Sequence, residues 1–139
     1  MSWFTCIATD AALDECCVGI SQEENTIIIE NEDRTLNIYR EQYEGYPEQY
    51  TKLPYIVGVE LGKYECVKAE LTAYLKNAVL LCNQLEVWSI WMDDPDQDIK
   101  YRRFKAEELS ETDITWIFDQ EYFEHPQCLK MYKWKRRPK

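Results

Sequence analysis

The chain has 139 residues, of which 45% are hydrophobic and 30% charged, a composition that suits one folded domain. The apolar fraction excludes intrinsic disorder, and no run approaches the roughly 20 apolar residues of a membrane-spanning helix. The net charge of -10 is unevenly spread, because all 26 Asp and Glu precede residue 130 while six bases lie in the last ten residues. We therefore expect an acidic body that repels phosphate backbones, attracts cationic surfaces and does not bind nucleic acid directly.

The start of the chain lacks the basic and long apolar regions of a secretory signal, so we expect a soluble, cytoplasmic protein. In that compartment the six cysteines should be reduced and mostly buried, as small apolar side chains. The adjacent pair Cys16 and Cys17 lacks the spacing of a zinc or redox motif, and we expect no metal site. The cysteines are Cys6, Cys16, Cys17, Cys66, Cys82 and Cys128.

The first part of the chain predicts mainly β-structure. A strand is expected at 3–9, followed by a short helix at 10–18 with Asp10 as its N-cap. The β-branched segment at 26–30 and the alternating segment at 35–39 flank turn residues, so a hairpin is predicted there. A tyrosine-rich loop at 39–55 comes next.

The middle of the chain predicts a strand, a long helix and a second strand. The strand is expected at 54–61. Apolar residues at spacings of three and four predict the main helix at 64–83. Residues 85–92 are apolar on both faces, as in a central strand covered on both sides.

The last part predicts three elements. Residues 99–106 are expected to form an antiparallel partner for the strand at 85–92. Ser110 and Asp113 have the spacing of a capping box before a short helix at about 111–119. A final strand is expected at 128–134.

These elements predict a single α+β domain over residues 1–139. An antiparallel or mixed sheet packs against one main helix, with a short second helix and a basic C-terminal tail at 130–139. The tail could contact RNA or an anionic membrane, but a solvated terminus or an internal counter-charge to the acidic body is the preferred interpretation.

Four aspartates in the turn after the central strand form the first candidate site. They are Asp93, Asp94, Asp96 and Asp98. Alternating carboxylates suit Ca²⁺, but the glycine and the glutamate that an EF-hand requires are missing at the corresponding positions. We therefore interpret the segment as a solvated turn that could also bind Lys and Arg of a basic partner.

The tyrosine-rich loop is the second candidate. Tyr and Glu residues alternate there, a composition suited to gripping Lys-rich or Arg-rich surfaces by stacking and charge-assisted hydrogen bonds. The alternative is that these tyrosines pack on the sheet. The residues concerned are Tyr43, Glu44, Tyr46, Glu48 and Tyr50.

Catalytic motifs are not evident. His125 and Cys128 are the one Cys/His pair close in sequence, and a buried thiol beside a loop histidine is the preferred interpretation. The four glycines are scattered singly, so no phosphate-binding loop is predicted, and no cofactor is expected.

Three segments, at 85–91, 107–118 and 122–129, resemble small bacterial immunity proteins in their pattern of strands, capped helix and aromatic positions. These are the antidotes encoded beside the toxins of contact-dependent growth inhibition and related polymorphic toxin systems. The resemblance implies a cytoplasmic, non-catalytic protein that binds and neutralises its cognate toxin domain. It carries over no binding residue, because such families diverge most at their toxin-binding surfaces.

Two other hypotheses stay open. The chain could be a small enzyme or ligand-binding domain with a pocket between the main helix and the sheet, lined by Trp88, Trp91 and Tyr101. It could also be an acidic mimic of nucleic acid that inhibits a nuclease. The oligomeric state is not predicted.

Overall fold

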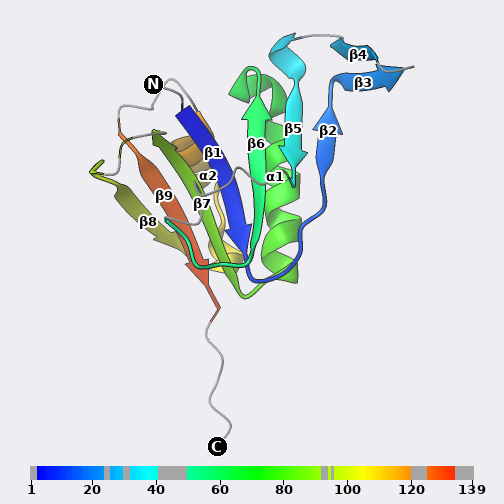
Figure 1. The fold of residues 1–139 in the computed structure, drawn as a ribbon. Helices are drawn as coiled ribbons and strands as arrows, with labels where there is room; N and C mark the ends of the chain where they lie inside the picture. The colour runs from blue at the N-terminus through cyan, green and yellow to red at the C-terminus, as the bar shows by residue number, and fades with distance from the viewer. Residues whose placement is uncertain are drawn as a thin grey trace, which may run out of the picture.

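The computed structural model describes residues 3–23, 26–29, 32–40, 50–91, 94, 96–119 and 125–133. Seven strands of this part form one mixed sheet in the order β2-β5-β6-β1-β7-β9-β8, and β3 pairs only with β4 in a separate ribbon (Figure 1). The strands of the large sheet are β1 (Trp3–Thr9), β2 (Cys16–Val18), β5 (Leu36–Tyr39), β6 (Tyr55–Leu61), β7 (Gln84–Trp91), β8 (Lys100–Phe104) and β9 (Gln127–Tyr132). The ribbon consists of β3 (Ile20–Glu23) and β4 (Thr26–Ile29).

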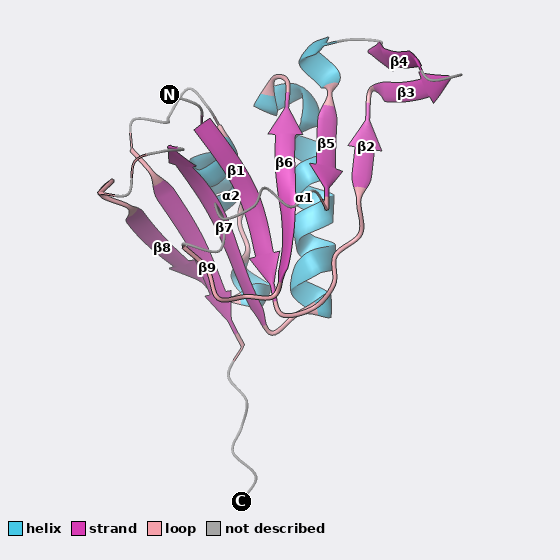
Figure 2. Ribbon diagram, viewed as in Figure 1, coloured by secondary structure: helices cyan, strands magenta, loops and turns pink. Residues whose placement is uncertain are grey.

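Both α-helices of the described chain, α1 (Tyr64–Leu81) and α2 (Glu111–Phe118), cover the same face of the sheet (Figure 2). Helix α1 buries the apolar residues that recur along one side of it, as its sequence pattern predicts. They pack with the inward-facing residues of the strands and of α2 into the main core. Its fully buried members include Ile7, Leu36, Ile38, Leu71, Leu85, Ile114, Ile117, Leu129 and Met131. The predicted α+β domain, with a mixed sheet, one main helix and a short second helix, is confirmed.

The capping box at the start of α2 is also confirmed. The Asp113 amide donates to the Ser110 hydroxyl at 3.2 Å, and the Ser110 amide donates to the Asp113 carboxylate at 3.2 Å. The other carboxylate oxygen of Asp113 accepts from Arg102 Nε at 2.7 Å, so β8 is tied to the helix start. Asp113 therefore fixes both the first residue of α2 and its position against the sheet.

Two predictions about local structure are wrong near the N-terminus. Residues 12–15 are irregular and 16–18 form β2, so there is no helix at 10–18. Asp10 accepts hydrogen bonds from the Asn83 and Gln84 amides instead, at 2.8 and 3.1 Å. The segments at 26–30 and 35–39 do not form a hairpin, because β4 pairs with β3 while β5 lies between β2 and β6.

The strand expected at 99–106 exists as β8, but its predicted antiparallel pairing with β7 is wrong. Strand β9 lies between them, antiparallel to β7 and parallel to β8. Strand β7 is central and buried over most of its length, as predicted. Two short 3₁₀ helices, η1 (Glu32–Arg34) and η3 (Ala106–Glu108), complete the described elements.

No helix in the described part of the chain is both long and apolar enough to cross a membrane.

Candidate functional site

The face of the sheet opposite the helices carries a second, smaller apolar cluster. Its buried members are Phe4, Cys6, Trp88, Ile90 and Cys128. Tyr50, Ile56 and Ile99 pack against it and are partly buried. Tyr50 belongs to the tyrosine-rich loop, and Ile99 directly follows the aspartates of the turn after β7. The cluster therefore anchors both candidate segments to the same face of the sheet.

Gln97 holds the turn after β7 in place. Its side-chain oxygen accepts from the Trp91 amide at 2.9 Å, and its Nε2 donates to the Trp91 carbonyl at 3.0 Å. Nε2 also lies 2.8 Å from the Asp94 carbonyl and 2.8 Å from the Tyr50 hydroxyl. The Gln97 side-chain amide therefore hydrogen-bonds to both backbone groups of Trp91, as a neighbouring strand would. It also holds the Asp94 carbonyl and the Tyr50 hydroxyl in place.

The structure brings Tyr50 and the aspartates together. The Tyr50 ring lies 5.7 Å from the Trp88 ring, and its hydroxyl donates to the Asp94 carbonyl at 3.4 Å. Asp94 Oδ1 accepts from the Asp96 amide at 3.2 Å, which tightens the turn. Asp94 is half-buried, whereas Asp96 and Asp98 are exposed.

We call Asp94, Asp96 and Asp98 the acidic turn. Among the residues that the structure describes, no Lys or Arg forms an ion pair with any of the three. The other predicted binding residues, Tyr43, Glu44, Tyr46, Glu48 and Asp93, lie outside the described residues.

Sequence reasoning missed a network of charged and aromatic side chains on the same face. Glu86 is 7% exposed and accepts hydrogen bonds from Trp88 Nε1 and from the Tyr132 hydroxyl, both at 3.1 Å. The Lys130 ammonium lies 3.8 Å from Glu86, 5.4 Å from the Trp88 ring centre and 4.8 Å from that of Tyr101. Burial, and then the Glu86 carboxylate, raise the pKa of Tyr132, so that this hydroxyl stays a hydrogen-bond donor.

The network depends on register. Glu86 and Lys130 are direct cross-strand partners in the β7–β9 ladder. Because the two residues are far apart in sequence, no local pattern indicates the pairing. The available signal is the one charged residue of a mostly apolar strand, Glu86, which requires a partner when it is buried.

The arrangement does not support nucleophilic catalysis by Cys128. The thiol is buried, and burial raises its pKa well above the ordinary value, so that it stays protonated. His125 is exposed. No group of three or more His, Cys, Asp or Glu side chains in the described ranges is placed to hold a metal ion.

The expected pocket between helix and sheet is not lined as predicted. Trp88 and Tyr101 lie on the opposite face, where their rings meet edge to face with centres 6.0 Å apart. Trp91 lies at the end of β7 and makes an edge-to-face contact with Trp3. The space between α1 and the sheet is occupied by the main core.

Gln97 provides a test of how the turn is held. We expect Gln97→Ala to lower the free energy of unfolding by about 1–2 kcal/mol, because it removes several partly buried hydrogen bonds. Amide hydrogen exchange should show lost protection at Trp91. Gln97→Glu keeps an acceptor for the Trp91 amide but loses both donors, so it should retain that protection in part. Unchanged exchange at Trp91 in Gln97→Ala would show that the turn is held by other contacts.

Comparison with protein-family models, with curated proteins and with solved structures found no match to this chain.

Proposed function

We propose that this chain is a non-catalytic immunity protein that binds and neutralises a cognate, basic toxin domain through an acidic, tyrosine-containing surface. The observation that carries the proposal is the acidic turn, whose carboxylates have no ion-pair partner among the described residues and whose backbone is fixed by Gln97 and Tyr50.

Preorganisation is what makes this turn suited to binding. A flexible acidic loop loses conformational entropy when it meets its partner, whereas a turn already held by hydrogen bonds loses much less. Unpaired carboxylates also raise the rate of encounter with a cationic partner, and they orient that partner as it approaches. Both effects favour fast and tight binding of a basic protein, and neither requires a catalytic group.

The first experiment is to purify the protein from its native host at low salt and to identify what remains bound. A stoichiometric basic toxin domain is the result we expect. Recovery of the protein alone, or with a small molecule, would contradict the proposal and favour the ligand-binding alternative. Recovery with a nuclease that is not its toxin would favour the nucleic-acid mimic.

With the partner in hand, the triple variant Asp94→Asn, Asp96→Asn and Asp98→Asn tests the surface. We expect the association rate to fall about tenfold at low salt and to depend less on salt, because electrostatic steering is reduced. Asn keeps the side-chain oxygen that accepts from the Asp96 amide, so the turn should stay folded.

The matched control removes the same number of negative charges elsewhere, by Glu65→Gln, Glu70→Gln and Glu107→Gln. These three side chains are exposed and lie on α1 and η3. If stopped-flow measurements show the same loss in both triple variants, only net charge matters and the acidic turn is not the contact surface.

A further inference from the structure

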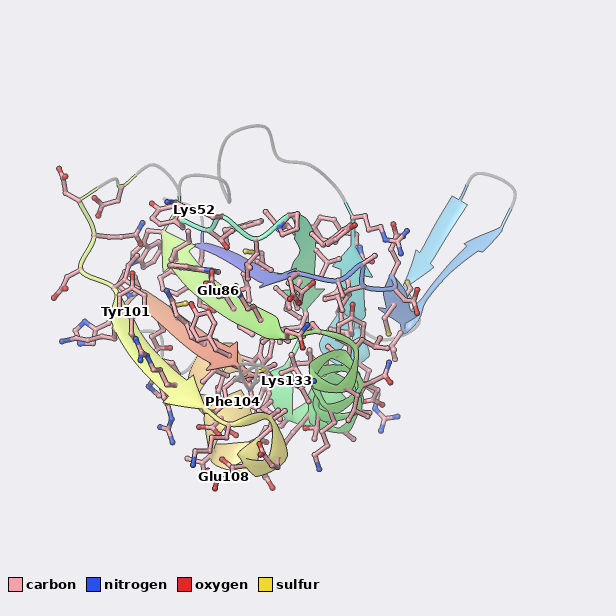
Figure 3. All side chains as sticks on the ribbon, turned by 90° about the horizontal axis from the view of Figure 1, so that it is seen from below. Lys52, Glu86, Tyr101, Phe104, Glu108 and Lys133 are labelled. Carbon is pink, nitrogen blue, oxygen red and sulfur yellow. The ribbon has the colours of Figure 1, made fainter. Side chains whose placement is uncertain are left out.

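The end of the sheet at which β8 and β9 finish carries two adjoining hollows (Figure 3). The larger has a volume of about 860 Å³ and reaches Phe104, the last residue of β8. The smaller, of about 640 Å³, extends to Leu80 in the last turn of α1. Lys105, Tyr132 and Lys133 line both hollows, so the two form one surface, which we call the end surface.

Charge on the end surface is balanced, in contrast to the rest of the molecule. Three acids and four bases line it, and one of the bases, Lys130, lies 3.8 Å from Glu86. With Glu86 counted, four acids accompany four bases, whereas the rest of the chain holds 22 acids and 12 bases. Two copies of so acidic a molecule repel each other, and this repulsion is weakest where the local charges cancel. The charged lining residues are Asp10, Arg103, Lys105, Glu107, Glu108, Lys130 and Lys133.

Both signs of charge are available for contacts with another molecule. Lys105, Lys133, Glu107 and Glu108 form no ion pair with any residue in the described part of the chain. A purely acidic partner would place carboxylates against the two glutamates, and a purely basic one would place cations against the two lysines. A second copy of the chain carries both signs, so a two-fold arrangement can set the acids of each copy against the bases of the other.

Exposed apolar side chains accompany these charges. Leu80 is 78% exposed and Tyr132 is 42% exposed, and removing both from water would favour association. Leu80 also protrudes beside a hollow, so the end surface offers a projection and a cavity at the same place. Such a surface can fit a rotated copy of itself, because each copy supplies the side chain that fills the hollow of the other.

We propose that the end surface is the interface of a symmetric dimer of this chain. Leu80 of each copy would enter the larger hollow of the other and cover Phe104 and Tyr132. The two lysines of each copy would face Glu107 and Glu108 of the other. The acidic turn precedes the first residue of β8, about 13 Å from the last, and so stays outside this interface.

The dimer should be weak. Fourteen residues line the two hollows, whereas a standard protein interface uses about 20–30 residues on each side. The net charge of -10 on each copy opposes association further. We therefore expect a dissociation constant of about 10 µM, so that both monomer and dimer occur in the micromolar range.

Sedimentation equilibrium of the full chain over about 1–200 µM tests the proposal. A reductant is included, because Cys17 is exposed and could form a disulfide between copies. The average mass should rise from that of one chain to nearly that of two. The mass of a single chain at every concentration would overturn the proposal, as would growth beyond two chains, since a two-fold interface is closed.

Two leucines at the end of α1 locate the interface. Leu80→Ser should raise the dissociation constant about tenfold, because an apolar side chain that the dimer buries becomes polar. Leu81→Ser makes the same change at the adjacent residue, which is 54% exposed but lines neither hollow, and should change the constant less than about twofold. Both side chains are exposed in the monomer, so both variants should fold. Equal dissociation constants for the two variants would overturn the assignment to this surface.

Exchange of charges tests the two-fold pairing. One variant carries Lys105→Glu and Lys133→Glu, and the other carries Glu107→Lys and Glu108→Lys. Each should dimerise about tenfold more weakly than the wild type, whereas an equal mixture should recover the wild-type mass, since opposite charges then meet again. The second variant is less acidic than the wild type, so overall repulsion cannot account for its loss. Undiminished association of either variant alone, or no recovery in the mixture, would overturn the proposal.

A partner protein is the alternative occupant of the end surface. If the wild-type chain stays a monomer, while Leu80→Ser weakens binding of the basic domain recovered from the host, the surface serves that domain and the dimer proposal is wrong. The sedimentation experiments use this chain alone, so their result is independent of the function proposed above.

Discussion

Raising the pH from 9 to 11 is expected to lower the free energy of unfolding by about 4 kcal/mol through two buried thiols alone. Cys6 and Cys128 lie in the cluster on the open face of the sheet, with 1% and no exposed surface, respectively. Burial raises the pKa of Cys6 from 9.0 to about 12 and raises that of Cys128 as well. Both thiols therefore stay largely protonated in the folded state over this pH range.

Whether stability rises or falls with pH depends on how many protons the folded and unfolded states bind. Well below pH 9 both states hold these protons, so the thiols contribute no pH dependence there. Between pH 9 and the folded-state pKa values, the unfolded chain has lost protons that the native protein still holds, so stability falls as pH rises. Each thiol contributes up to about 1.4 kcal/mol per pH unit.

Urea unfolding at a series of pH values checks this expectation. The double variant Cys6→Ala and Cys128→Ala should be less stable at pH 8, because two buried side chains become smaller, but its stability should fall less steeply above pH 9. Cys17→Ala, at an exposed thiol, is the matched control and should keep the wild-type slope. Parallel curves for the double variant and the wild type would show that other groups cause the alkaline loss.

Replacing Asp113 is expected to have a large effect on stability, although this residue lies outside the apolar core. Asp113→Ala should lower the free energy of unfolding by about 3 kcal/mol, of which about 1 comes from the lost cap and the rest from the charge-assisted bond to Arg102. Asp113 is 6% exposed, so its carboxylate is not readily replaced by water. Loss of the bond to Arg102 also frees β8 from α2.

Denaturant unfolding followed by circular dichroism measures this difference. Glu107→Ala removes an exposed carboxylate from the neighbouring η3 and should change stability by less than about 0.5 kcal/mol. Arg102→Met keeps the apolar stem and the capping box, but it leaves the buried Asp113 carboxylate without its cation, so it should be strongly destabilising as well. If Asp113→Ala and Glu107→Ala cost the same, the capping box and the ion pair contribute little to stability.

The elements predicted correctly are those that local sequence determines. The helix at 64–81 follows from a stripe of apolar residues, and the start of α2 follows from Ser110 and Asp113, three positions apart. The buried run of β7 likewise indicates a strand without knowledge of its neighbours. In each case, the interactions that decide the structure occur within a few residues.

Pairing between distant segments could not be predicted in the same way. Turn residues after β4 indicate a change of direction, but they do not show that β4 joins β3 while β5 joins β6. The segment of β8 follows β7 directly in the chain, yet β9 occupies the place beside β7. That choice depends on burial of Leu129 and Met131 in the main core, which no short window contains.

The candidate site, too, could be predicted from the sequence only in part. The aspartates of the acidic turn are visible in the sequence because they are clustered. The sequence does not show how the turn is held, because Gln97 donates to the hydroxyl of Tyr50, 47 positions earlier. No local pattern marks Gln97 as the residue that makes this contact. The Glu86 and Lys130 pair needs a register that only the assembled sheet provides.

The central position of β1 has a consequence for how the chain folds during its synthesis. Residues 3–9 are synthesised before both of their neighbours in the sheet, β6 and β7. At about 5–20 residues per second, roughly 4–16 s pass between the synthesis of Thr9 and that of Trp91. Through that interval a largely apolar strand has at least one unpaired edge, and such an edge is prone to aggregation until β7 has been made.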